Sequence, residues 1–273
     1  MFDGLSASLA ARLGFTAAYL TGAGLAASGF GLPDIGLVTQ TEMAERARVI
    51  VRAAGGLPVI ADADTGYGSA LNVVRTVQEY QAAGVAAIQL EDQAFPKKCG
   101  HLPGKELIGA AEFAVKLAAA RDARGDDELV LIARTDARAP LGLDEAIRRA
   151  NLYAQAGADV IFIEAPQGVS EIERIAAEVA APKLINLVVG GLTPLESKER
   201  LAGLGYAIAI HPGIPLAQTA LAMLSGLAEL AGKDPAALIP SRPAEFFNLV
   251  GLAEWSAIGE RFRAGPAQEQ PWA

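Results

Sequence analysis

VAAIQLEDQAFPKKCGH, residues 85–101, joins a short apolar run to a polar segment that contains proline and glycine. The apolar run, 85–90, predicts a buried β-strand, and the residues after it predict a loop at the carboxyl end of that strand. This loop holds Cys99, the only cysteine of the chain, and His101, one of its two histidines. Carboxylates, two ammonium groups, a thiol and an imidazole therefore lie on the one loop that follows this strand.

The same pattern recurs along the chain, with a period of roughly 25 to 30 residues that is typical of βα units. Six further short apolar runs predict strands at 17–21, 57–61, 128–133, 159–163, 183–187 and 206–210, with helical segments between them. Strands that are apolar throughout indicate a parallel sheet covered on both faces. The length of 273 residues suits a TIM-type (β/α)8 barrel of roughly 250 residues. We therefore predict an α/β fold of this type.

The two ends of the chain depart from a regular barrel. Only residues 1–4 precede a first short helix at 5–13, so we expect a truncated first strand. We assign residues 1–232 to the barrel and 233–273 to a C-terminal extension, in which a linker leads to a helix at 245–263. The apolar stripe of that helix predicts packing on a neighbour or on the outside of the barrel. Residues 201–228 carry no charge, but Pro212, Gly213 and Pro215 predict a strand and a core-facing helix there, not a membrane span.

Composition narrows the choice of partners and compartment. The formal net charge of −8 argues against nucleic acid as a partner. One cysteine excludes an intrachain disulfide and fits a reducing compartment. No basic and apolar leader is apparent at residues 1–20, and we expect a cytoplasmic protein.

Polar residues collect where the predicted strands end, which is where parallel barrels build their sites. They are Tyr19, Thr21, Asp62, Asp64, Glu91, Arg134, Asp136, Glu164, Asn186 and His211. Carboxylates that converge on one axis repel each other unless a cation lies among them. Asp62 and Asp64 point the same way on an extended strand, and with Glu91 they predict a site for Mg²⁺ or Mn²⁺. The alternative is that Asp62 and Asp64 cap the following helix.

Cys99 has two interpretations. A lone cysteine is commonly a buried structural residue. Here it lies beside Lys97, Lys98 and His101, and positive neighbours lower the pKa of a thiol. We therefore expect Cys99 to act as a proton donor or nucleophile, on a loop that opens and closes over the site.

Other strand-end residues also leave alternatives open. Arg134 suits a substrate carboxylate or a developing enolate, or else a salt bridge to Glu164 or Asp136. Asn186 either donates to a carboxylate or holds a turn. His211 is more typical of a structural histidine than of a catalyst. The backbone N–H groups of residues 22–24 either bind an anion or belong to a tight turn.

Three motifs resemble the isocitrate lyase/phosphoenolpyruvate mutase superfamily, and the likeness extends over nearly the whole chain. They are Lys97-Lys98-Cys99-Gly100-His101, Asp62-Ala63-Asp64-Thr65-Gly66-Tyr67-Gly68 and Glu91-Asp92-Gln93. The Lys-Cys-Gly-His form is similar to the carbon–carbon lyase branch, which includes methylisocitrate lyase and 2,3-dimethylmalate lyase. The resemblance implies an (α/β)8 barrel and a homotetramer whose subunits exchange C-terminal helices.

The resemblance also implies roles for individual residues. Mg²⁺ would be held by Asp62 and Asp64, in part through water, with Glu91 in the outer set. A substrate carboxylate would be held by Thr21, Gly22 and Ala23. The rest of the pocket would be lined by Asp34, Lys97, Arg134, Glu164 and Asn186, with His211 at a position where tyrosine is common. Relatives carry glutamate where this chain has Val189, and these two departures favour a small or less polar malate derivative.

The expected reaction is a Mg²⁺-dependent cleavage of a 2-hydroxy dicarboxylate, of malate or methylisocitrate type. The products would be a 2-oxo acid such as pyruvate and a second carboxylic acid. Tyr19 or a carboxylate would be the base, Arg134 would stabilise the enolate, and Cys99, assisted by Lys97 and His101, would protonate it. The rival predictions are an oxaloacetate decarboxylase or hydrolase, a phosphonopyruvate-type enzyme, and a non-catalytic barrel.

Overall fold

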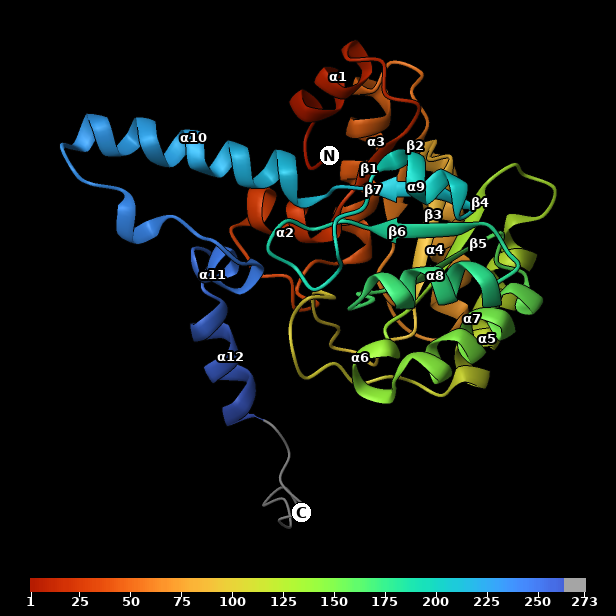
Figure 1. Cartoon of the computed structure of the whole chain (residues 1–273). Helices are drawn as coiled ribbons and strands as arrows, with labels where there is room; N and C mark the ends of the chain where they lie inside the picture. Colours follow the sequence, from red (N-terminus) through yellow and green to blue (C-terminus); the bar gives the residue numbers. More distant parts are fainter. Residues whose placement is uncertain (263–273) are drawn as a thin grey trace, which may run out of the picture.

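Seven parallel strands form one sheet in the computed structural model, which describes residues 1–262 (Figure 1). They pair in chain order, from β1 to β7. Their bounds are β1 Ala18–Leu20, β2 Val59–Asp62, β3 Ala87–Glu91, β4 Val130–Thr135, β5 Val160–Ile163, β6 Lys183–Asn186 and β7 Tyr206–Ile210. Every predicted strand is present, with its ends within two residues of the expected position. The sheet curves into a nearly closed barrel, which confirms the predicted fold class.

Helices cover the outside of this sheet and connect successive strands (Figure 1). The connecting helices include α3 Gln40–Ala53, α4 Ala70–Ala83, α5 Ala110–Arg124, α7 Leu143–Ala156, α8 Val169–Glu178 and α9 Lys198–Gly203. The predicted helix at the amino end is α1, Gly4–Arg12. Two helices were not predicted, α2 (Gly22–Phe30) and the short α6 (Arg138–Leu141). Three glycines within α2 explain why it was not predicted, because glycine disfavours helix interiors.

The expected truncated first strand is visible as a single residue. The carbonyl of Met1 accepts a hydrogen bond from the backbone N–H of Thr21 at 3.1 Å, and its amino group donates to the carbonyl of Tyr19. These two bonds flank Leu20 in the manner of a parallel bridge. Met1 therefore lies beside β1, where a preceding strand would lie.

Two cores on opposite faces of the sheet decide which residues point into the barrel. The inner core contains Ile60, Ala87, Ile132, Val160, Phe162, Leu184 and Ile210. The larger outer core packs the other strand face against the helices. Because strand side chains alternate, a residue two positions after an inner one also faces inward. Asp62, Arg134, Glu164 and Asn186 each follow an inner residue by two positions, so they point into the mouth of the barrel.

The C-terminal part forms an arm that projects from the barrel (Figure 1). It consists of α10 (Gly213–Ala231), a 3₁₀ turn (Ala236–Leu238), α11 (Pro243–Asn248) and α12 (Leu252–Arg261). The prediction of a core-facing helix is wrong for α10, in which only Ala228 is buried. The single helix expected at 245–263 is two helices, because Gly251 adopts a left-handed conformation between them; residue 263 lies outside the described part.

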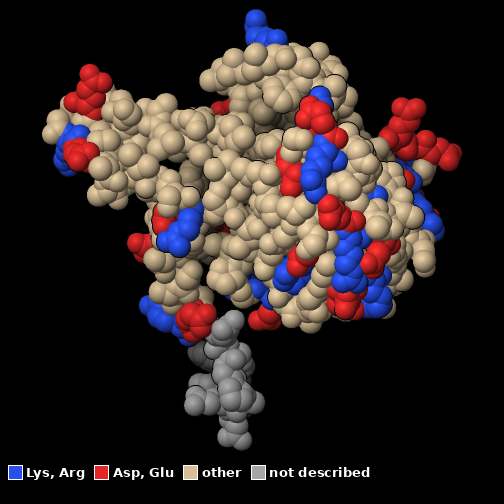
Figure 2. All heavy atoms as spheres, viewed as in Figure 1, with Lys and Arg blue, Asp and Glu red and all other residues tan. Residues whose placement is uncertain are grey.

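The charged side chains on and just after α10 gather at its far tip, whereas acidic and basic side chains crowd the helices of the barrel (Figure 2). Helix α10 is the one described helix that is long and apolar enough to cross a membrane by length and composition. Its exposed apolar side chains include Ile214, Met223, Leu227 and Leu230.

Candidate active site

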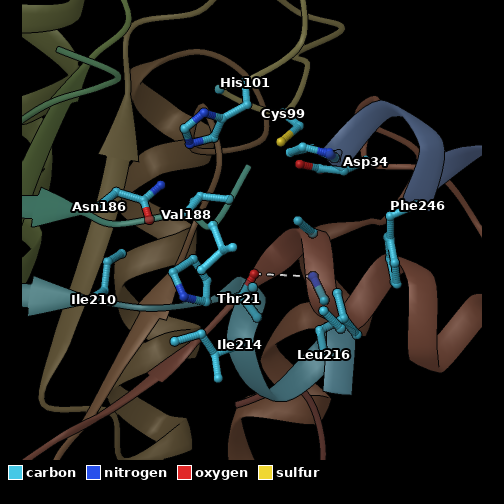
Figure 3. A pocket seen from close by; sticks show the side chains of 18 of the residues that line it. Thr21, Asp34, Cys99, His101, Asn186, Val188, Ile210, Ile214, Leu216 and Phe246 are labelled. Atoms are coloured by element: carbon cyan, nitrogen blue, oxygen red, sulfur yellow. Dashed lines mark hydrogen bonds between the residues drawn. The ribbon is translucent and has the colours of Figure 1, made fainter. Parts of the chain in front are cut away.

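A cavity of about 410 Å³ opens at the carboxyl ends of the strands. Its polar lining includes most of the inward-facing residues singled out from the sequence, namely Tyr19, Thr21, Asp34, Asp62, Cys99, His101, Arg134, Glu164 and Asn186. Figure 3 shows side chains of several different elements arranged around this space. The apolar side of the cavity comes from Val188, Val189, Ile210 and the arm, including Ile214, Leu216 and Phe246.

The amino end of α2 provides one wall of the cavity. Thr21 caps this helix, since its hydroxyl oxygen accepts a hydrogen bond from the N–H of Gly24 at 3.2 Å. Thr21 and Ala23 line the cavity. The N–H of Gly22, predicted to bind a substrate carboxylate, instead donates to Asp62 Oδ2 at 3.2 Å. A side chain at Gly22 would lie 2.8 Å from the same oxygen, so this close approach requires glycine.

Asp62 and Asp64 lie together, and the structure places a lysine against them. Lys97 forms ion pairs with Asp34 and with Asp64, the second at 2.8 Å. Burial, and to a lesser extent the carboxylate of Asp62, raises the pKa of Asp64 to about 7 despite the charge of Lys97. The helix-capping alternative does not hold, because Ser69 is the N-cap residue of α4.

Arg134 forms the salt bridge to Asp136 that the sequence left open, and its side chain also lines the cavity. Its guanidinium lines the cavity and forms ion pairs with Asp136 at 2.9 Å and with Glu91 at 3.1 Å. It also lies over the ring of Phe162, 5.4 Å from the ring centre. Glu91 is therefore bound by an arginine, and within residues 1–262 no group of three His, Cys, Asp or Glu side chains is close enough to hold a metal.

The loop after β3 covers the cavity and places Cys99 and His101 at its edge (Figure 3). The backbone N–H of Cys99 donates to the carbonyl of Asp34 at 3.0 Å, which fixes the loop to the segment after α2. Burial raises the pKa of the Cys99 thiol to about 12. Lys97 and a hydrogen bond to the backbone of His101 lower this pKa, as expected, but desolvation and the charge of Asp34 outweigh them, so the expected net lowering is wrong. A thiol that keeps its proton is suited to donate it, not to attack as a thiolate.

His101 is held as a neutral imidazole. Its Nδ1 accepts a hydrogen bond from the backbone N–H of Leu192 at 3.3 Å, so its proton is on Nε2, which lies 3.4 Å from Glu164 Oε1. Burial lowers the pKa of His101 below its ordinary value. His101 is therefore bound to the backbone of Leu192 and lies beside Glu164, and as a neutral ring it adds no positive charge next to Cys99.

Tyr19, Asn186 and His211 differ in how well they match their predicted roles. Tyr19 donates to Gln89 Oε1 at 2.6 Å, and burial raises its pKa well above the ordinary value. The phenol keeps its proton near neutral pH, which favours a carboxylate as the base. The amide nitrogen of Asn186 donates to Glu164 at 3.3 Å, while its buried oxygen has no partner and remains available to a ligand in the cavity. His211 is exposed and does not line the cavity, because it alternates with the inner residue Ile210.

Three site residues were missed in the sequence. Gln89 donates to Asp62 Oδ1 at 3.4 Å and to Glu91 Oε2 at 3.3 Å, and it is the single polar residue in the apolar run 85–90, which is a signal that could have identified it. Gln93 and Lys105 form hydrogen bonds with the backbone of the loop after β3, at Lys98 and at Gly100. Gln93 belongs to the third family motif but was given no role, and Lys105 lies in a mixed polar segment in which no local pattern distinguishes it.

Comparisons with known proteins identify the family to which the chain is similar. The family model of phosphoenolpyruvate phosphomutase matches residues 1–231. The chain is 46% identical over 266 residues to the 2,3-dimethylmalate lyase of Eubacterium barkeri, covering 96% of this chain and 92% of that protein. It is 49% identical over 210 residues to a 2-methylisocitrate lyase of Halalkalibacterium halodurans, covering 77% and 69%. A structure of oxaloacetate acetylhydrolase with 3,3-difluorooxalacetate matches with a TM-score of 0.80 and 35% identity, covering 96% and 90%.

Proposed function

The chain belongs to the phosphoenolpyruvate phosphomutase family, and we propose that it cleaves an alkyl-substituted malate into a 2-oxo acid and a second carboxylic acid. The predicted reaction class, cleavage of a carbon–carbon bond, is confirmed by relatives that are named 2,3-dimethylmalate lyase and 2-methylisocitrate lyase. The observation that carries the proposal within this class is the protonated thiol of Cys99 at a cavity with one polar and one apolar side.

A divalent cation fits the charge of the site. Six buried carboxylates surround the barrel mouth, from Asp34, Asp62, Asp64, Glu91, Asp136 and Glu164. Three buried cations accompany them, from Lys97, Lys105 and Arg134. With all six ionised, the excess of negative charge would repel a dicarboxylate substrate. The raised pKa of Asp64, about 7, and that of Glu91 are what such crowding and burial produce, and one divalent cation would offset most of the excess. We propose Mg²⁺, with Mn²⁺ as a substitute, held by Asp62 and Asp64; Glu91 belongs to the surrounding hydrogen bonds.

The residues of this chain then have separate roles in a reverse aldol cleavage. The bound cation would neutralise the carboxylate and hydroxyl oxygens of the part that becomes the 2-oxo acid. The free oxygen of Asn186 and the hydroxyl of Thr21 offer hydrogen bonds that orient this part in the cavity. A buried carboxylate takes the hydroxyl proton, and scission leaves the bonding pair on the second fragment as an enolate. Arg134 stabilises the enolate, and Cys99 transfers its proton to the carbon.

The apolar side of the cavity favours a substrate with alkyl substituents. Val188, Ile210 and Ile214 face the same space as Cys99 and Asn186 (Figure 3). Each methylene or methyl group buried there contributes roughly 0.8 kcal/mol. The side chain of Val189, which lines the cavity, offers a third carboxylate neither a charge nor a hydrogen-bond donor. A malate with methyl groups therefore fits better than a tricarboxylate.

The rival function is action on oxaloacetate, which the likeness to oxaloacetate acetylhydrolase supports. The test is an assay of 2,3-dimethylmalate, 2-methylisocitrate, isocitrate and oxaloacetate with Mg²⁺, and again with EDTA in its place. Pyruvate and glyoxylate release and oxaloacetate consumption are measured. We expect cleavage of 2,3-dimethylmalate to dominate and EDTA to abolish it. Consumption of oxaloacetate alone would establish the rival.

We also propose a cytoplasmic homotetramer in which neighbours exchange their C-terminal arms. Met223, Leu227 and Leu230 lie on one face of α10 at helical spacing and are at least 57% exposed. An apolar stripe of this kind on a projecting helix marks a protein interface. The single cysteine, Cys99, is free, which is compatible with a reducing compartment.

The arm can be tested by a charge placed on its apolar face. Leu227→Glu is expected to reduce the mass in sedimentation from that of four chains to that of one or two, because the carboxylate would be buried without a partner. Glu229→Gln, on the opposite face of α10, serves as the matched control and should remain tetrameric. A tetramer that survives Leu227→Glu would contradict the exchange of arms.

A further inference from the structure

Lys105 connects the loop over the cavity to the barrel. Its ammonium group donates to the carbonyl oxygen of Gly100 at 2.6 Å and to Asp136 Oδ1 at 2.7 Å. Its side chain is 3% exposed, and that of Asp136 is completely buried. Gly100 is the residue between Cys99 and His101. The ammonium therefore joins the centre of the loop to the end of β4.

Gln93 makes a second connection at the start of the same loop. Its amide oxygen accepts from the backbone N–H of Lys98 at 3.0 Å, and its amide nitrogen donates to the carbonyl of Lys98 at 2.8 Å. The same nitrogen lies 2.9 Å from Glu91 Oε1. The side chain of Gln93 thus holds both backbone groups of Lys98, one residue before Cys99, and ties them to a buried carboxylate of the barrel.

The two connections end on the two carboxylates that hold Arg134. Asp136 binds the guanidinium through Nε and Nη2, at 2.9 and 3.0 Å, and Glu91 lies 3.1 Å from Nη1. The position of the loop is therefore set from the same two groups that set the position of Arg134. Asp92 supports this arrangement from the outer side of the sheet, because it accepts from the backbone N–H of Asp136 at 2.9 Å.

We propose that Lys105 and Gln93 are positioning residues that hold residues 97–101 closed over the cavity. They thereby fix the position of Cys99 relative to Arg134. Neither side chain lines the cavity, so neither contacts the substrate. Each acts through the backbone of the loop and through a carboxylate partner of Arg134. Without Lys105, Gly100 loses a charged hydrogen bond and the loop opens more often.

Cys99 provides a direct readout of this opening that needs no substrate, because it is the only thiol of the chain. The rate of its alkylation by N-ethylmaleimide is measured in the folded full-length protein. Lys105→Met keeps the apolar stem and removes the donor. Loss of a charged hydrogen bond predicts an increase of about 10- to 100-fold in the alkylation rate. Lys105→Arg, which retains charge and donors, should restore part of the protection.

Lys98→Met is the matched control, because the Lys98 ammonium donates to Gly104 within the loop at 3.0 Å and is exposed. It should alkylate at the wild-type rate. Gln93→Leu is the second variant and decides the matter if circular dichroism shows that Lys105→Met does not fold. The proposal is overturned if Lys105→Met, or Gln93→Leu in its place, is alkylated no faster than Lys98→Met. This outcome is independent of the proposed function, since no enzymatic turnover is measured.

Once a substrate has been identified, steady-state kinetics separate positioning from binding. An open loop removes the proton donor and leaves the polar walls of the cavity in place. Lys105→Met should therefore lower kcat about tenfold or more, while KM changes little. An unchanged kcat with a raised KM would contradict the role of Lys105 in placing Cys99.

Discussion

Replacement of Cys99 by serine should lower kcat by about 10²- to 10⁴-fold, the range that a positioned general acid contributes. Serine is close in size to cysteine and leaves the loop intact. Its hydroxyl is a much weaker acid than the thiol, whose pKa is already raised to about 12 by burial. The enolate left by carbon–carbon scission would then wait for a proton from water, which the closed loop excludes.

The expected loss of kcat must be distinguished from a loss of ligand binding. Binding of oxalate, a planar mimic of the 2-oxo acid product, is measured by calorimetry in the presence of Mg²⁺ for wild type and for Cys99→Ser. We expect the same affinity within about threefold, since Cys99 faces the other fragment. Full activity in Cys99→Ser would show that the proton comes from another group.

Gly100→Ala should lower kcat/KM by about 100-fold, because it prevents the loop from closing. A methyl group at Gly100 would lie 2.0 Å from Glu164 Oε1 and 2.5 Å from Arg134 Nη2. Both neighbours are buried and held by other partners, so neither can move aside. Overpacking of about 3 kcal/mol in the closed state corresponds to roughly a hundredfold loss of that state.

Gly109→Ala is the matched control for this substitution. Gly109 lies at the end of the same connection, and the nearest heavy atom to an added methyl group is 4.0 Å away. This variant should keep the wild-type kcat/KM, and both variants should show the thermal transition of the wild type. An active Gly100→Ala enzyme would mean that the closed loop seen here is not the reacting arrangement.

The fold could be predicted because the sequence pattern of each βα unit is local and recurs along the chain. Each strand is a short apolar run that ends at polar residues, and each of these patterns survives in the structure. The arm could not be predicted to project, because a helix that packs on its own core and one that packs on a second chain have the same apolar surface. The helix α10 illustrates this, since its apolar sequence does not reveal that only Ala228 is buried within this chain.

The site was predicted as a set of residues but not as a network of charges. Alternation along the strands explains why Asp62, Arg134 and Glu164 face the cavity and why His211 does not. The pKa of Cys99 could not be predicted from its neighbours in the sequence. Lys97 is bound to Asp34 and Asp64 and buried with them, so its charge is largely neutralised before it reaches the thiol. Long-range contacts of this kind, like that of Lys105 with Asp136, exist only in the folded chain.

The most direct test of the lyase account is the position of deuterium in the products of 2,3-dimethylmalate cleavage in D₂O. Cleavage between the second and third carbons yields pyruvate and propionate. A thiol fixed on one side of the cavity should place a single deuterium on one face of the second carbon of propionate, in amounts equal to the pyruvate formed. Mass spectrometry and chiral analysis of the propionate measure both quantities. Deuterium on both faces in equal amounts, or no release of pyruvate, would contradict the account.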